Sequence, residues 1–149
     1  MFYNTDDLND GEIYLKLDRT ADENIERGYV PAYYFKITRV SDKVELGTCD
    51  LRIGHNNNTY YGGNIGYTIY EEHRGNYYAG KACMLLCDLA QIHNLEHVVI
   101  SCSPENISSQ KTCEYAGAVF EKIIDVPEWH ELYKEGQTRT CRYIIDLTI

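Results

Sequence analysis

The sequence predicts a mixed α/β (α+β) fold in which helices pack on one sheet of mixed strand direction. Alternating, β-branched and aromatic residues indicate strands in residues 12–70 and again in residues 118–147. Between these regions the spacing of apolar residues becomes helical, is interrupted by one short apolar run, and then becomes helical again. Strands, then helix–strand–helix, then further strands is an order typical of a mixed sheet covered by helices.

Four strands are expected before the helical region. The run EIYLKLD alternates apolar and polar residues, whereas AYYFKITRV is aromatic and β-branched. The expected strands are residues 12–18, 32–40, 44–53 and 64–70. We expect the polar segment 21–28 to be a loop or a short helix, and the Asn- and Gly-rich segment 55–63 to be a connection.

The second half of the chain is expected to alternate helices and strands. Gly117 suits the end of the second helix, because glycine readily adopts the left-handed conformation found there. The expected elements are helices over residues 77–94 and 106–116 and strands over residues 97–102, 118–126 and 140–147. The first helix joins strands 64–70 and 97–102 in a βαβ unit, so these two strands should be parallel.

Composition and charge restrict the class of protein. The chain has 149 residues, which we interpret as one domain over residues 1–149. A net charge of -9 argues against general binding to nucleic acid or to an anionic membrane, although one anionic ligand could still bind. The sequence shows no run of about 20 apolar residues and no secretory signal at its start, so we expect a cytoplasmic protein. A homodimer remains open.

The cysteines are expected to be free thiols. They lie at positions 49, 83, 87, 102, 113 and 141 and form no CxxC pair. Without such pairs, a disulfide framework or a zinc site is a weaker interpretation than small buried side chains. We therefore expect no metal.

The turn over residues 71–82, EEHRGNYYAGKA, has the chemistry of an anion site. A glycine-containing turn here opens a helix, whose free N–H groups and dipole attract negative charge. Arg74 and Lys81 would add positive charge, and small residues such as Gly80 would let a ligand approach the backbone. The alternative is an ordinary strand-to-helix turn in which Gly75 only marks the bend.

The run HRGNYYAGKACMLL resembles the acyl-CoA signature of the GNAT superfamily of N-acyltransferases. That signature is Arg or Gln, two residues, Gly, one residue, then Gly or Ala. Arg74 and Ala79 match its first and last positions, and Tyr77 stands where the pattern has glycine.

A second resemblance lies in ENISSQKTCEYAGAVF, which is similar to the second motif of that family. Asn106, Ser109 and Gly117 match it residue by residue. The fragment SCSPENISSQKTCEYAGA is similar to the branch that includes ribosomal-protein N-terminal acetyltransferases. The resemblance covers roughly residues 30–147.

The resemblance implies a GNAT fold, with a mostly antiparallel central sheet, helices on both faces and a splayed parallel strand pair. It implies that pantetheine bonds to strand backbone like an added strand, while the pyrophosphate meets the amides of residues 75–80. The residues assigned to CoA are Ile69, Tyr70, Arg74, Gly75, Asn76, Tyr77, Tyr78, Ala79, Gly80, Asn106 and Ser109.

The reaction implied is transfer of an acetyl group from acetyl-CoA, the co-substrate, to a primary amine. The amine would belong to a small molecule or to a protein N-terminus. The alternative is a non-catalytic module that binds acyl-CoA without turnover.

Catalytic candidates are Cys113, Asp50 and Asn106. Many family members have a tyrosine acid seven residues after the asparagine, where this chain has Cys113, which is either a proton donor or an inert buried thiol. Asp50 and Arg52 share one strand face, which either lines a substrate pocket or is solvated. His130, in the late polar segment, is a further base candidate or a plain surface residue.

Overall fold

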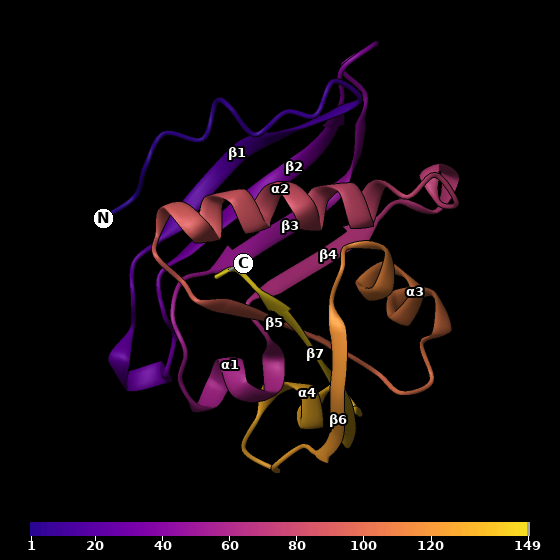
Figure 1. Cartoon of the computed structure of the whole chain (residues 1–149). Helices are drawn as coiled ribbons and strands as arrows, with labels where there is room; N and C mark the ends of the chain where they lie inside the picture. The colour runs from indigo at the N-terminus through magenta and orange to yellow at the C-terminus, as the bar shows by residue number, and fades with distance from the viewer. Residues whose placement is uncertain (149) are drawn as a thin grey trace.

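One seven-stranded sheet organises the protein, and the computed structural model describes residues 1–148 of it (Figure 1). The strand order is β1-β2-β3-β4-β5-β7-β6, and every neighbouring pair is antiparallel except β4–β5, which is parallel. The strands are β1 (Ile13–Ala21), β2 (Ala32–Arg39), β3 (Glu45–Arg52), β4 (Ile65–Ile69), β5 (His97–Cys102), β6 (Val119–Asp125) and β7 (Arg139–Asp146). The predicted mixed, mostly antiparallel sheet is confirmed.

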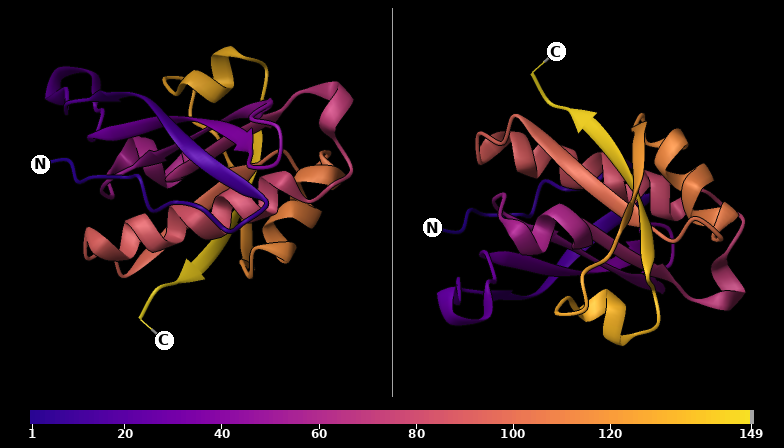
Figure 2. Two further views of the ribbon diagram at one scale, coloured as in Figure 1. Left: turned by 90° about the horizontal axis from the view of Figure 1, so that it is seen from above. Right: turned by 90° about the horizontal axis from the view of Figure 1, so that it is seen from below.

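Helices lie on both faces of this sheet. The helices are α1 (Asn57–Gly62), α2 (Tyr78–Ile92), α3 (Ile107–Tyr115) and α4 (Glu131–Lys134), with 3₁₀ turns η1 (Ile25–Arg27) and η2 (Glu71–His73). Figure 2 shows α2 and α3 on one face and η1 and α4 on the opposite face. This layering separates the molecule into a CoA-signature face, which carries α2, and an opposite face.

Two short helices fall in segments that the sequence predicts as connections. Helix α1 begins with a capping box, in which the Asn56 side chain accepts from the Thr59 N–H and the Thr59 hydroxyl accepts from the Asn56 N–H. Helix α4 starts at His130, whose ring nitrogen accepts from the Leu132 N–H. Caps rather than apolar periodicity specify these helices, so periodicity could not reveal them.

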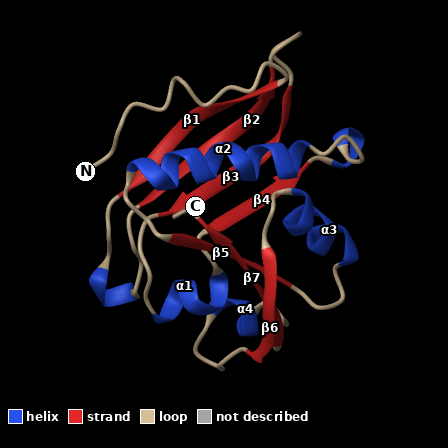
Figure 3. Ribbon diagram, in the orientation of Figure 1, coloured by secondary structure: helices blue, strands red, loops and turns tan. Residues whose placement is uncertain are grey.

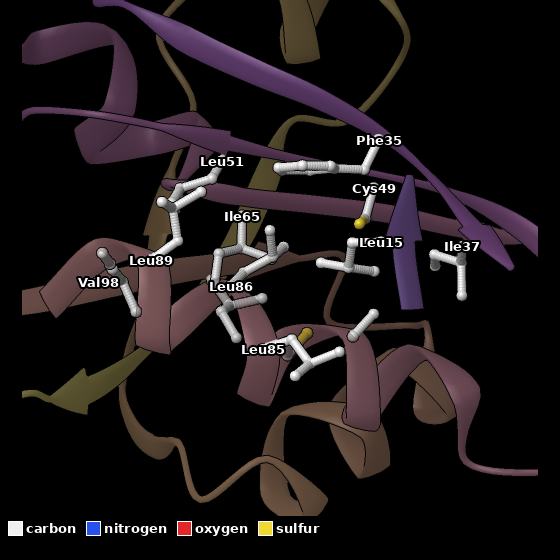
Figure 4. Close-up of a cluster of buried hydrophobic side chains, with 14 of the residues drawn as sticks. Leu15, Phe35, Ile37, Cys49, Leu51, Ile65, Leu85, Leu86, Leu89 and Val98 are labelled. Carbon is white, nitrogen blue, oxygen red and sulfur yellow. The ribbon is translucent and has the colours of Figure 1, made fainter. Parts of the chain in front are cut away.

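The core lies between α2 and the sheet (Figure 4). Phe35, Leu51, Ile65, Leu86 and Leu89 are each at most 2% exposed. Burying one such side chain contributes about 1.5–3 kcal/mol relative to leaving it exposed. These contacts fix α2 against β1–β4 and thereby hold its first turn beside the end of β4.

The parallel pair β4–β5 opens into a wedge. Between these two strands only Ile65 and Ile100 pair. Beyond them β4 continues to Ile69 and β5 to Cys102, and these residues do not pair with each other. Figure 3 shows the two strands diverging towards α3. The splayed parallel pair implied by the resemblance is therefore confirmed.

Asn64 joins the strands at the closed end of the wedge. Its side-chain amide donates to the carbonyls of Arg52 (3.0 Å) and Gly54 (2.8 Å), and its side-chain oxygen accepts from the Val99 N–H (2.9 Å). Its own N–H donates to the Val99 carbonyl at 2.7 Å. The residue is fully buried, and these four bonds satisfy it at the point where β3, β4 and β5 meet.

All six cysteines carry free thiols. In residues 1–148 no three or more His, Cys, Asp or Glu side chains are grouped to hold a metal ion. No helix of this part of the chain has the length and apolar character needed to cross a membrane.

Candidate functional site

The turn between β4 and α2 presents six consecutive backbone N–H groups, from Gly75 to Gly80. None of them has a hydrogen-bond partner within residues 1–148; the first bonded amide is that of Lys81, which donates to the Tyr77 carbonyl at 3.0 Å. The N-cap residue Tyr77 makes no side-chain cap bond. Free N–H groups at the positive end of a 15-residue helix dipole are suited to a phosphate or pyrophosphate.

Tyr77 has the left-handed conformation that glycine adopts most readily, with φ of 63°. A tyrosine is disfavoured there, yet its ring stacks on Tyr115 with centroids 5.0 Å apart and planes 19° apart. The stack joins the start of α2 to the end of α3. At the position where the family signature has glycine, the backbone therefore keeps a glycine-like conformation although the side chain is large.

Gly80 serves helix packing. A Cβ atom at this position would overlap Cδ1 of Tyr115, so the tyrosine ring lies directly against the glycine. The interpretation of Gly80 as a point of close ligand approach is therefore replaced by close approach of α3 to α2. Tyr115 lies two residues after Cys113 on α3, so its ring points towards α2 and not into the core beside that thiol.

Of the two cations expected at the turn, one is already paired. The Lys81 ammonium lies 2.7 Å from the Glu12 carboxylate. Arg74 is exposed and donates through Nε to the Ile69 carbonyl at 3.0 Å, and its remaining N–H groups make no bond within residues 1–148. Arg74 is thus the cation that can still meet an anion at this turn.

The edge of β4 that faces the wedge has free backbone groups. The bonds from Arg52 N–H to Asn64 O and from Tyr70 N–H to Leu46 O show that even-numbered residues of this strand bond to β3. Alternation along an antiparallel pair therefore directs Tyr67 and Ile69 towards β5, which has already diverged. The Ile69 carbonyl already accepts from Arg74 Nε, so the groups left for an extended ligand, bound as an added strand, are those of Tyr67 and the N–H of Ile69.

The expectation for Tyr70 is corrected by the same register. Its N–H donates to Leu46 and its carbonyl accepts from the His73 N–H, both at 2.9 Å. Neither group is free for pantetheine. Tyr67, and not Tyr70, is therefore the residue that offers backbone groups for pantetheine together with Ile69.

Helix α3 is fixed over the wedge by two side chains. Asn106 is its N-cap, and its side chain accepts from the Ser109 N–H at 3.0 Å. The Tyr67 hydroxyl lies 2.5 Å from the Ser109 Oγ, so β4 and α3 are bonded across the opening. Burial raises the pKa of Tyr67, so its phenol stays protonated at neutral pH.

Cys113 belongs to the core. It is 0% exposed and contacts Cys102, where a hydrogen bond between the two thiols and burial raise the pKa of Cys102. A thiol without solvent contact in an apolar cluster behaves as a small hydrophobe. The geometry therefore favours packing over proton donation by Cys113.

Asp50 lies on the opposite face of the sheet, directly over Gly66 at the start of the wedge. A Cβ at Gly66 would lie 2.6 Å from Oδ1 of Asp50, so glycine at this position lets the carboxylate lie against β4. The side chain is 17% exposed; Oδ2 lies 3.3 Å from Arg52 Nε but accepts no hydrogen bond. The solvated-face interpretation is therefore wrong for Asp50.

Burial raises the pKa of Asp50, and the charges of Arg52 and Arg19 offset part of that rise. A carboxylate whose pKa is raised and whose oxygen lacks a donor is a stronger base than a solvated aspartate. This is the property required of a group that takes a proton from an amine.

A pocket of about 360 Å³ lies on the same face as Asp50. Its walls come from the end of β1, the loop that follows η1, β2, the end of β3, α1 and α4. Tyr34 and Arg52 line it, and both are neighbours of Asp50, the first across the strand pair and the second along β3. Asp50 itself does not line the pocket, but its carboxylate lies against both Arg52 of the pocket wall and Gly66 of β4.

His130 lines this pocket but is neither a base nor a surface residue. It is 3% exposed; Nδ1 accepts from the Leu132 N–H (3.1 Å), and Nε2 lies 3.0 Å from the Asn58 carbonyl. These bonds place the proton on Nε2 and occupy both nitrogens. His130 fixes α4 against α1, and both interpretations from the sequence are corrected.

Sequence reasoning missed Tyr67, Gly66 and Asn64. Tyr67 and Gly66 read as ordinary members of a strand, and Asn64 as its first residue. Their roles depend on where β5 diverges and on what packs across the sheet, neither of which leaves a local pattern.

Known proteins share this architecture. The profile of the acetyltransferase (GNAT) domain matches residues 1–119. Curated protein sequences gave no match.

Three solved structures illustrate the similarity. The ribosomal-protein-S5-alanine acetyltransferase of Vibrio fischeri gives a TM-score of 0.62 at 21% identity, over 78% of this chain and 62% of that one. The microcin C7 self-immunity acetyltransferase, in complex with acetyl-CoA and AMP, gives a TM-score of 0.62 at 20% identity, over 77% of this chain and 61% of that one. A mutant of the Vibrio cholerae spermidine N-acetyltransferase gives a TM-score of 0.60 at 18% identity, over 78% of this chain and 65% of that one.

The chain thus spans about three fifths of the length of these structures, and at such identities they show a common fold. The family profile covers most of the chain and includes the wedge, the turn and α2. This chain belongs to the acetyltransferase (GNAT) domain family.

Proposed function

We propose that this protein transfers an acetyl group from acetyl-CoA to a primary amine. The observation that carries the proposal is the combination of a wedge, with free backbone groups at Tyr67 and a free N–H at Ile69, and six unbonded amides from Gly75 to Gly80. An extended arm that ends in a pyrophosphate fits both features. The amine would belong to a small molecule or to a protein N-terminus.

Asp50 is the base in this proposal. It takes one proton from the ammonium of the acceptor, and the amine nitrogen then attacks the thioester carbon. The C–N bond forms as the carbonyl electrons move onto oxygen, where we assign the free Tyr67 N–H as donor. The C–S bond then breaks, and the CoA thiolate leaves and takes up a proton from solvent. The amide nitrogen gives its second proton to solvent.

The test measures two quantities on the whole chain. Calorimetry with CoA reports binding, and thiol release from acetyl-CoA with a panel of primary amines reports turnover. We expect binding together with amine-dependent release. Binding without release from any amine class would favour the non-catalytic module, and failure to bind CoA would overturn the proposal.

Arg74→Glu is expected to weaken CoA binding about tenfold or more. The substitution replaces the one cation that remains free at the turn by an anion beside the pyrophosphate, and a charge-assisted bond is lost with it. Calorimetry measures the dissociation constant. Arg27→Glu, with the same charge change in η1 at the opposite end of the molecule, is the matched control (Figure 1). Equal weakening by both variants would show that only net charge matters.

Cys113→Ala is expected to keep most of the acetylation rate per folded molecule and to lose about 1 kcal/mol of stability. The thiol is a buried packing group, and its removal leaves a small cavity. Urea unfolding gives the stability, and thiol release gives the rate. A rate loss of about 10²-fold in a folded variant with unchanged CoA affinity would instead identify Cys113 as the proton donor.

A further inference from the structure

The ring of Tyr77 presents an open aromatic face at the start of α2. Tyr115 covers one face of this ring, with the two planes 19° apart, yet Tyr77 is still 67% exposed. The opposite face of the Tyr77 ring therefore lies in solvent. Neither hydroxyl has a hydrogen-bond partner among residues 1–148, so both side chains act through their rings.

The contact between α2 and α3 does not need this ring. Tyr115 makes that contact itself, because it lies against Gly80 where a Cβ atom would overlap it. Glycine at position 77 would adopt the observed φ of 63° without the steric cost that a side chain has there. The chain instead holds a large aromatic ring in a disfavoured conformation and leaves most of it exposed, as is found at residues that clamp a ligand.

The open face belongs to the same turn as the unbonded amides. The Tyr77 N–H is one of the six from Gly75 to Gly80, so its ring adjoins the place where phosphates would bind. Figure 1 shows the start of α2 next to α3, whose last residue is Tyr115. A ligand that runs from the wedge to these amides carries whatever follows its phosphates towards this pair of rings.

We propose that the outer face of the Tyr77 ring stacks on the adenine base of CoA. This inference rests on the proposed function and adds a contact from a side chain that stands where the family signature has glycine. Stacking of a base on an aromatic side chain strengthens binding about tenfold. Tyr115 supports the Tyr77 ring from behind and does not touch the base.

The contact makes this chain selective for donors that carry a nucleotide. The amides and Arg74 meet phosphate groups, which CoA shares with phosphopantetheine. The Tyr77 ring meets a group that only CoA has. CoA thioesters are therefore favoured over donors that end at phosphopantetheine, such as acyl carrier proteins.

The experiment measures binding of CoA and of 4′-phosphopantetheine, which lacks the nucleotide half of CoA, by calorimetry on the whole chain. Asparagine tolerates positive φ, so Tyr77→Asn removes the ring and keeps the turn. We expect this variant to bind CoA about tenfold more weakly and phosphopantetheine as wild type does. Tyr77→Phe keeps the ring and should keep the affinity for CoA.

Two further variants serve as controls. Tyr133→Asn removes an exposed tyrosine from α4, on the opposite face of the sheet, and should change neither affinity. Arg74→Glu should weaken both ligands, because both carry a phosphate. Urea unfolding establishes that each variant is folded.

Three results would overturn the inference: equal affinity of wild type for the two ligands, unchanged CoA affinity in Tyr77→Asn, or equal weakening of both ligands by that variant. Loss of CoA affinity in Tyr77→Phe as large as in Tyr77→Asn would overturn it too, since the hydroxyl and not the ring would then be responsible. All of these leave CoA binding at the amides, and with it the proposed function, in place. Only failure of the wild type to bind CoA would remove both.

Discussion

Asp50→Asn should lower kcat/KM for acetyl transfer by about 10²-fold or more and at the same time raise the midpoint of thermal unfolding. The loss of rate follows from removal of the base that takes the ammonium proton. The gain in stability follows from burial, which raises the pKa of Asp50 and leaves Oδ2 without a hydrogen bond. Activity and stability are expected to change in opposite directions at this residue.

The sign of the stability change can be worked out from that pKa. Because the folded pKa lies above the unfolded value, the folded state binds more protons between the two. Stability therefore falls as pH rises through this window, and the ionised carboxylate destabilises the fold at neutral pH. Asparagine has no charge to desolvate, so the variant escapes this cost, while Arg52 keeps its bonds to Gly62 and Gly63.

Calorimetric unfolding between pH 3 and pH 8 checks this prediction. The variant should be more stable than wild type at neutral pH; this advantage should shrink as pH falls through the window between the folded and unfolded pKa, and be lost below the unfolded pKa of about 3.9. Asp88→Asn, on the exposed side of α2, is the control for a carboxylate without burial. A variant that keeps its rate, or that melts lower than wild type at neutral pH, would show that Asp50 is a structural ion-pair partner of Arg52.

Gly80→Ala is expected to destabilise the protein by about 1–3 kcal/mol, because its methyl group would overlap the Tyr115 ring. In a Tyr115→Ala background the same change should become stabilising by up to about 1 kcal/mol, since alanine is the better helix former. A change of sign with background isolates the contact between the two residues. Urea unfolding of the four proteins in this cycle measures it.

Gly75→Ala is the matched control for that cycle. Gly75 has φ of 89°, and no other atom lies within 4 Å of the place where an alanine methyl group would stand. The cost of this substitution is therefore backbone strain and should not depend on Tyr115. CoA affinity of the Gly80→Ala/Tyr115→Ala protein gives a second result. A large loss of affinity in this folded double variant would restore Gly80 as a point of ligand approach.

The sheet could be predicted from the sequence because each strand carries its own local pattern. Alternation indicates β1, β-branched and aromatic residues indicate β2, and the change to helical spacing indicates α2. The parallel pairing of β4 and β5 followed from the crossover between them. The two helices that were missed, α1 and α4, have no apolar period.

In the candidate site, too, the features that are contiguous in sequence could be predicted, whereas those made by tertiary contacts could not. The turn at Gly75–Gly80 is contiguous in sequence, so its N–H groups could be expected from the strand–turn–helix pattern alone. Asp50 over Gly66 depends on pairing between two strands, and the Tyr67–Ser109 bond joins residues 42 positions apart. Such contacts are decided by tertiary packing, for which a single sequence carries no periodic signal.

The joint at Asn64 has a mechanical consequence. At the closed end of the wedge, the Asn64 side chain and one strand pair hold β4 to β5, and at the open end the Tyr67–Ser109 bond holds β4 to α3. Beyond that joint β4 continues for four residues, about 13 Å, paired with β3 but no longer with β5. A rotation of β3 and β4 together by roughly 5° about the joint would move the end of β4 by about 1 Å, so the Asn64 joint and the Tyr67–Ser109 bond together set the width of the opening.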